Sequence, residues 1–202
     1  MNLLRFSALL FIIIKCMTTA ASTSEKDKNF ILQRVKEIER TPNYLNNPNL
    51  VKELGVLYYY LATEEEVYLE PSKKCFERLK VLQPAWLAVS EAYLATLTAL
   101  RAKYTLWPID KLSYANTALV QLDKCVRKSP TNIEILYLRA VLCHNLPIFF
   151  NRKSTAIQDC KNICKYMKQS KSLYPVDFIQ DVIRFLKSTN YLSPYEIQLL
   201  ES

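Results

Sequence analysis

Glycine is almost missing from this chain of 202 residues, because Gly55 is the only one. Hairpin turns and phosphate-binding loops need backbone with positive φ or with no side chain in the way, and glycine supplies both. The chain therefore lacks the residues for most hairpins, for a Walker loop and for the sharp turn that carries a nucleophilic serine. Since half of the residues are hydrophobic, the composition predicts an all-α fold of one or two domains.

Histidine is equally scarce, with His144 as the single example. Histidine-based zinc sites need several ligands of that kind, and a Cys-His nucleophile pair needs a histidine base. We therefore expect no metal, no cofactor and no enzymatic activity, and an enzyme stays an alternative only if its pocket uses His144 or a carboxylate. The consecutive glutamates 64–66 would point in different directions on a helix, so they predict a solvated loop.

The first 21 residues have the features of a cleaved export signal. Arg5 precedes the apolar run 6–14, the small residues 18–22 follow, and cleavage is expected after Ala21. The apolar run is far shorter than the roughly 20 residues that a membrane-spanning helix needs. We therefore expect an exported protein of the periplasm, the cell envelope or the extracellular space.

Cys16 makes a lipoprotein the alternative, because lipid attachment there would tether the chain to a membrane. Lys15, however, stands where the lipid-attachment motif expects a small residue. The expectation therefore remains a cleaved signal, with membrane association only through a lipidated Cys16 or a basic surface.

The chain is basic, with a net charge of +8 that falls to +6 when residues 1–21 leave with Arg5 and Lys15. The remaining cations are spread along the expected helices, which is typical of solvated faces. Nucleic-acid binding favours an arginine-rich stripe with interleaved aromatics, so nucleic acid is not expected as a partner. Association with an anionic membrane surface through a basic face is a further alternative.

Residues 84–103 are the stretch around which the chain is organised. Their apolar residues recur every three and four positions, which predicts a helix with one packed face. Trp86 and Tyr93 lie on that face and are expected to be locked between neighbouring helices. The opposite side of this helix, between Ser90 and Arg101, is the expected place for a partner.

Two segments share one pattern of residue types. A large residue is followed three positions later by a Leu-like residue, then directly by a small residue, and three positions after that by an aromatic residue. The residues are Val51, Leu54, Gly55 and Tyr58 in the first segment, and Trp86, Val89, Ser90 and Tyr93 in the second. This pattern resembles the first helix of the tetratricopeptide repeat. Phe76, Leu79 and Pro84 resemble the end of the second helix of that repeat. The prolines that end successive units are Pro48, Pro84, Pro130 and Pro175. They stand 36, 46 and 45 residues apart, so each unit is longer than one repeat of that family.

The resemblance implies antiparallel helix pairs stacked as a short right-handed solenoid over residues 49–175. An N-terminal helix and linker would occupy 22–48, and a capping helix pair 176–202. In the third unit Tyr137 replaces the small residue, so we expect its side chain to hold two helices apart.

The resemblance also implies a non-enzymatic interaction or scaffold protein, because first helices of such repeats line a groove that binds peptide segments of partners. Three partner-binding residues are predicted. Among the consecutive tyrosines 58–60 at least one must leave the packed stripe, and Tyr59 is the candidate. Arg101 and Arg139 are candidate binders of a partner's carboxylates.

The five cysteines that follow residue 21 all fall on or near apolar helix faces: Cys75, Cys125, Cys143, Cys160 and Cys164. Free cysteine behaves as a small hydrophobe, so these positions predict thiols in the core. One or two disulfides, such as Cys143 with Cys160, stay open in an exported chain. A metal site that uses Cys160 and Cys164, one helical turn apart, is a third alternative.

Overall fold

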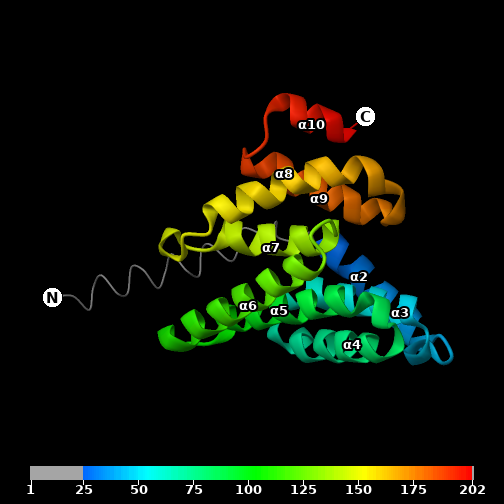
Figure 1. Cartoon of the computed structure of the whole chain (residues 1–202). Helices are drawn as coiled ribbons and strands as arrows, with labels where there is room; N and C mark the ends of the chain where they lie inside the picture. The colour runs from blue at the N-terminus through cyan, green and yellow to red at the C-terminus, as the bar shows by residue number, and fades with distance from the viewer. Residues whose placement is uncertain (1–24, 202) are drawn as a thin grey trace. The chain divides into compact units, whose positions relative to one another are not determined.

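The protein is all-helical, as the composition predicts (Figure 1). A computed structural model describes residues 25–201, and no strand occurs among them. The predicted export signal lies outside the described residues. The described helices are α2 (Glu25–Arg40), α3 (Pro48–Ala62), α4 (Leu69–Leu82), α5 (Leu87–Tyr104), α6 (Pro108–Lys128), α7 (Ile133–Asn145), α8 (Lys153–Ser170), α9 (Val176–Thr189) and α10 (Pro194–Glu201).

The chain divides into two compact units at the Leu122–Asp123 peptide, within α6. In unit 1, which ends at Leu122, α4 packs against both α3 and α5. In unit 2, which begins at Asp123, α7 packs along α8, and α10 contacts α8 and α9. Neighbouring helices therefore pack in pairs within each unit.

Three aromatic rings from three helices join the core of unit 1. Tyr93 of α5 is 3% exposed and stacks on Phe76 of α4, with ring centroids 4.3 Å apart. The ring of Tyr59 on α3 meets Tyr93 edge to face at 5.4 Å. Such pairs add to the free energy gained by burying their surface, so Tyr93 ties α3 and α4 to α5.

Gly55 lies where α3 and α4 come closest. A Cβ at this position would lie 3.0 Å from the Cβ of Cys75 and 3.1 Å from the ring of Phe76. The hydroxyl of Ser72 donates a hydrogen bond of 2.8 Å to the carbonyl oxygen of Gly55. The single glycine therefore sits where the approach of a second helix leaves no room for a side chain.

Helix α5 is enclosed by its neighbours on nearly every side. Only Leu87 and Arg101 are exposed along it, and nine of its residues are buried: Val89, Ser90, Ala92, Tyr93, Ala95, Thr96, Leu97, Ala99 and Ala102. The expectation of a partner surface between Ser90 and Arg101 is therefore wrong. Small alanine side chains on the polar side of the predicted stripe allow other helices to cover it.

The start of α5 also differs from the prediction. Residues Pro84–Trp86 form a separate 3₁₀ turn before α5 begins at Leu87. Trp86 is only half-buried, and the ammonium of Lys52 lies 5.2 Å from its ring centroid. Trp86 therefore lies at the edge of unit 1 and stays partly exposed, whereas Tyr93 is buried.

Helix α2 is attached to α3 by polar contacts. The guanidinium of Arg34 donates to both carboxylate oxygens of Glu53, with Nε–Oε1 and Nη2–Oε2 distances of 2.6 and 3.1 Å. The hydroxyl of Tyr58 donates to Glu39 at 2.6 Å, and burial together with this hydrogen bond raises the pKa of Tyr58. Lys28 pairs with Glu65 in the loop after α3.

Tyr137 does not separate α7 from α8 as expected. Its ring meets Phe178 and Phe185 of α9 edge to face, with centroids 5.7 and 5.6 Å apart. Helices α7 and α8 pack closely along each other, because the large side chain at position 137 belongs to the face that α9 covers. At the end of the chain, Ser193 and Glu196 form a capping box that starts α10.

Replacing Gly55 by valine is expected to lower the free energy of unfolding by about 1–3 kcal/mol, because the new side chain must displace Cys75 or Phe76 in a filled core. Urea unfolding followed by circular dichroism measures the change. Asn49→Val is the matched control, since Asn49 is an exposed position of the same helix. Equal unfolding midpoints for the two variants would contradict the close crossing of α3 and α4.

Candidate functional site

Tyr59 is not the exposed tyrosine that the sequence predicts. Tyr59 is half-buried, its hydroxyl lies beside Thr96 of α5, and loss of solvent raises the pKa of Tyr59 to about 12. Its ring contacts Tyr93. The side chain therefore contributes to the contact between α3 and α5.

Arg101 is exposed near the end of α5. Its Nη2 atom lies 3.9 Å from Oε2 of Glu70 on α4. A surface ion pair at this distance contributes little to stability. Among the three predicted partner residues, Arg101 is the one that the structure leaves open to solvent.

Arg139 does bind carboxylates, but they belong to its own unit. Its Nε and Nη2 atoms donate to the two oxygens of Asp159, at 2.8 and 2.7 Å. Its Nη1 atom donates to Asp123 at 3.0 Å. Burial alone would lower the pKa of Arg139. The hydrogen bonds and charges of these two carboxylates have the larger combined effect, so the pKa of Arg139 is raised.

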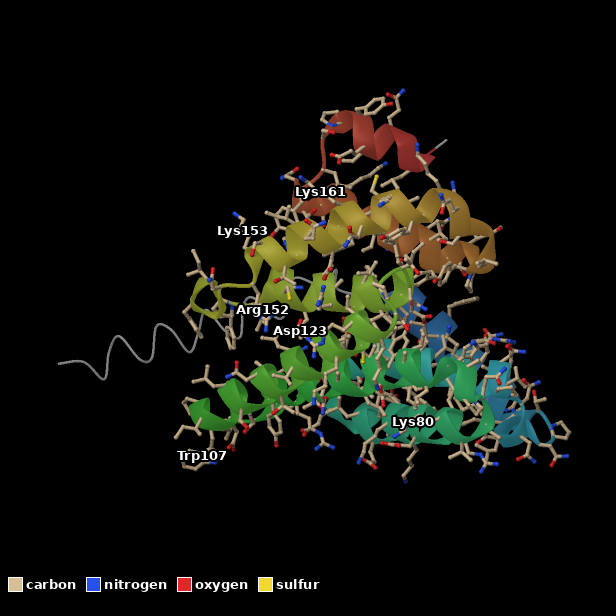
Figure 2. The ribbon with its side chains drawn as sticks, in the orientation of Figure 1. Lys80, Trp107, Asp123, Arg152, Lys153 and Lys161 are labelled. Carbon is tan, nitrogen blue, oxygen red and sulfur yellow. The ribbon has the colours of Figure 1, made fainter. Side chains whose placement is uncertain are left out.

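Arg152 completes this cluster, since its Nη1 atom lies 3.0 Å from the second oxygen of Asp123 (Figure 2). The Asp159 side chain is fully buried, and that of Arg139 is 14% exposed. Two cations and two anions cancel, so the cluster offers no net charge to a ligand. It joins α6, α7, α8 and the loop between α7 and α8, which indicates a structural role.

His144 lies among aromatic side chains. Its Nδ1 atom and the hydroxyl of Tyr191 share a hydrogen bond of 2.9 Å, and the ring of Phe185 meets the imidazole edge to face at 5.7 Å. Burial, and then the charge of Lys153, lower the pKa of His144. These contacts hold the imidazole in the packing between α7 and the segment that follows α9.

All five cysteines of the described residues are buried and outside any disulfide, which confirms their prediction as core residues. A disulfide between Cys143 and Cys160 is therefore not formed. Burial raises the pKa of Cys75, Cys143 and Cys160 to about 12, so these thiols stay protonated at neutral pH. Within residues 25–201 no group of three His, Cys, Asp or Glu is placed to hold a metal ion.

The sequence reasoning missed a concentration of positive charge in unit 2. Residues 123–202 carry twelve basic and seven acidic side chains, a net charge of +5, whereas residues 22–122 carry thirteen and twelve, a net charge of +1. Much of the excess lies on α8, where four exposed lysines follow one side of the helix: Lys153, Lys161, Lys165 and Lys168. Figure 2 shows Lys153 and Lys161 on the side of α8 away from α7.

A second surface that the sequence reasoning missed is apolar. Leu106, Trp107 and Ile109, at the turn from α5 into α6, are 86, 72 and 80% exposed. We call these three residues the apolar tip. Figure 2 shows Trp107 at the start of α6, with its side chain directed away from the helices.

Charged residues of both signs lie near the apolar tip, since Lys103 precedes it and Asp110 and Lys111 follow it. Asp110 follows it directly and is exposed. Tyr104 stands just before it, and burial followed by the charges of the glutamates 64–66 raises the pKa of Tyr104 to about 12. The tip therefore combines exposed apolar area with charges of both signs, whereas the exposed charged side chains of α8 are all positive.

A scan against models of protein families and searches of curated proteins and of solved structures found no match to this chain. Among the described helices, none is both long and apolar enough to cross a bilayer.

Replacing Asp159 by alanine is expected to lower the free energy of unfolding by about 3–5 kcal/mol, because Arg139 would remain in a buried site without its main partner. Asp123→Ala is the matched comparison and should cost less, since Asp123 is 20% exposed and solvent can replace it. Urea unfolding at neutral pH measures both. Equal losses would contradict the assignment of Asp159 as the main partner of Arg139.

Proposed function

We propose that this chain is an exported, non-enzymatic binding protein that recruits a protein partner through the apolar tip of unit 1. The observation that carries the proposal is the exposure of Leu106, Trp107 and Ile109, three large apolar side chains in four positions. Contiguous apolar surface of this kind marks interaction sites in soluble proteins. Tryptophan is also among the residues that contribute most to binding at the centres of interfaces.

The repeat arrangement proposed from the sequence is a right-handed, tetratricopeptide-like solenoid over residues 49–175. Two features of unit 1 support it. Gly55 occupies the crossing of a helix pair, and the Tyr59–Tyr93 contact joins α3 to α5, the first helices of successive proposed units. In this proposal the repeats serve as a rigid support for the tip, because α5 exposes too little surface to form a peptide groove.

The exposed apolar tip has charges of both signs beside it, so it gives an acidic membrane little electrostatic attraction. A protein pocket with an apolar floor would accept Trp107, and a basic group on its rim would pair with the exposed Asp110. We therefore propose a protein partner of that description.

Photo-crosslinking tests this proposal. A benzophenone amino acid at position 107 of the exported chain, in extracts of its native host, is expected to capture one protein that the same probe at position 81 does not. Val81 is the matched control, because it is 75% exposed on α4 of the same unit. Loss of the captured protein on Leu106→Ser with Ile109→Ser, and not on Val81→Ser, would support the tip as the interface.

Identical capture from positions 107 and 81, or crosslinks to lipid alone, would refute the proposed partner surface. Crosslinks between two copies of this chain would instead assign the tip to self-association.

Export and the state of the cysteines are tested together by the intact mass of the chain after alkylation. In denaturant, the exported protein is expected to start at Ser22 and to carry five alkyl groups, one for each core cysteine. In the folded state no group is expected, because all five thiols are buried. A chain that retains residues 1–21, or that carries fewer groups in denaturant, would contradict export or free thiols respectively.

A further inference from the structure

The surface of α8 has an unusually uniform charge. Residues 151–176 contain six basic side chains and one carboxylate, that of Asp159. Asp159 is fully buried and bound by Arg139, so it adds no negative charge to the surface. Every exposed ionised group of this segment is therefore a cation.

The lysines of α8 share one side of the helix. At about 100° per residue, positions 153, 161, 165 and 168 fall within roughly 120° of one another and extend along about 22 Å of helix. The adjoining side of the helix is packed into unit 2 by Ala156, Cys160, Ile163 and Met167. We call Lys153, Lys161, Lys165 and Lys168 the lysine face.

These ammonium groups are available to an external anion. Within residues 25–201 none of the four lies within ion-pair distance of a carboxylate. The charge of Lys161 helps to lower the pKa of Glu196 on α10, although the hydrogen bonds from Ser193 have the larger effect. The ammonium of Lys165 lies 5.4 Å from the ring centroid of Tyr166, a contact that leaves its remaining donors free.

Exposed apolar side chains stand at both ends of the lysine face. Before α8, Ile148 is 91% and Phe149 50% exposed. The turn that carries them is held by Asn151, which has a φ of 52° and donates its backbone N–H to the carbonyl oxygen of Ile148 at 2.9 Å. After α8, Leu173 and Val176 are 78 and 70% exposed.

From this combination we infer that the lysine face and its apolar ends bind the surface of an anionic lipid bilayer. Lysines along one helix side attract acidic headgroups, and flanking Ile, Phe, Leu and Val can enter the boundary between headgroups and acyl chains. Lysine also extends its apolar stem along such a boundary while its charge stays in water.

The same residues fit a nucleic acid less well. Readers of nucleic acid rely on arginine and on aromatics that stack on bases, and Arg152, which directly precedes α8, is bound to Asp123. Aliphatic side chains such as Ile148 and Leu173 gain nothing from contact with phosphate and sugar. The lysine face lies in unit 2 alone, so its binding to lipid does not depend on the partner proposed for the apolar tip.

Vesicle sedimentation tests the inference with the chain that starts at Ser22. We expect binding to phosphatidylcholine vesicles that contain phosphatidylserine, no binding to phosphatidylcholine alone, and release in high salt. The variant with Lys161, Lys165 and Lys168 changed to Gln should bind on the order of a hundredfold more weakly, since each lysine near the surface contributes about fivefold.

The matched control changes three other exposed lysines to Gln and loses the same net charge: Lys36, Lys74 and Lys124. It should bind within a few-fold of the parent. Equal weakening by the two triple variants would overturn the inference, because the effect would then come from net charge and not from α8.

A second variant, Ile148→Ser with Phe149→Ser, separates lipid from other anions. It keeps the lysine face and should weaken vesicle binding about tenfold through loss of apolar insertion. If this variant binds vesicles like the parent, and the parent binds RNA or polyglutamate as tightly as vesicles, the face binds acidic polymers and the membrane assignment is wrong.

Discussion

The enclosure of helix α5 is the constraint on which unit 1 depends. A helix that is apolar on one side and carries small residues on the other gains most when neighbours cover both sides, because each exposed methyl group costs free energy in water. Coverage from both sides requires α4 to pack closely on α3 and on α5. That requirement explains why the one glycine of the chain stands at position 55, and why Tyr93 contacts aromatic rings from two helices.

Unit 2 uses a different device at its centre. The Arg139 cluster places charged side chains between helices that are otherwise joined by apolar contacts, and its two arginines and two aspartates cancel. Because Asp159 is buried and paired with Arg139 inside the unit, the exposed charged side chains of α8 are all cations. The same ion pairs that join the helices therefore determine the sign of the charge that the unit presents to its surroundings.

The sequence predicts the helices well and the surfaces poorly, for physical reasons. Apolar spacing and proline positions identify the packed stripes and the breaks between helices, because burial and the missing proline N–H act locally. They cannot tell that alanines on the far side of α5 are also covered, since an alanine is compatible with either environment. Arg139 shows the same limit, because nothing in its local sequence reveals that Asp123 and Asp159 meet it in space. The lysines of α8 were visible in the sequence as a segment with a single acid, and a count of charge by segment would have separated them from the scattered cations.

The exposed lysines on one side of α8 make unit 2 electrically asymmetric. Near a charged surface such a unit experiences a torque as well as an attraction, and its orientation is biased before any contact forms. At physiological ionic strength this bias acts only within a Debye length of about 8 Å. Salt would therefore alter the angular distribution of approaching molecules as well as the strength with which they bind.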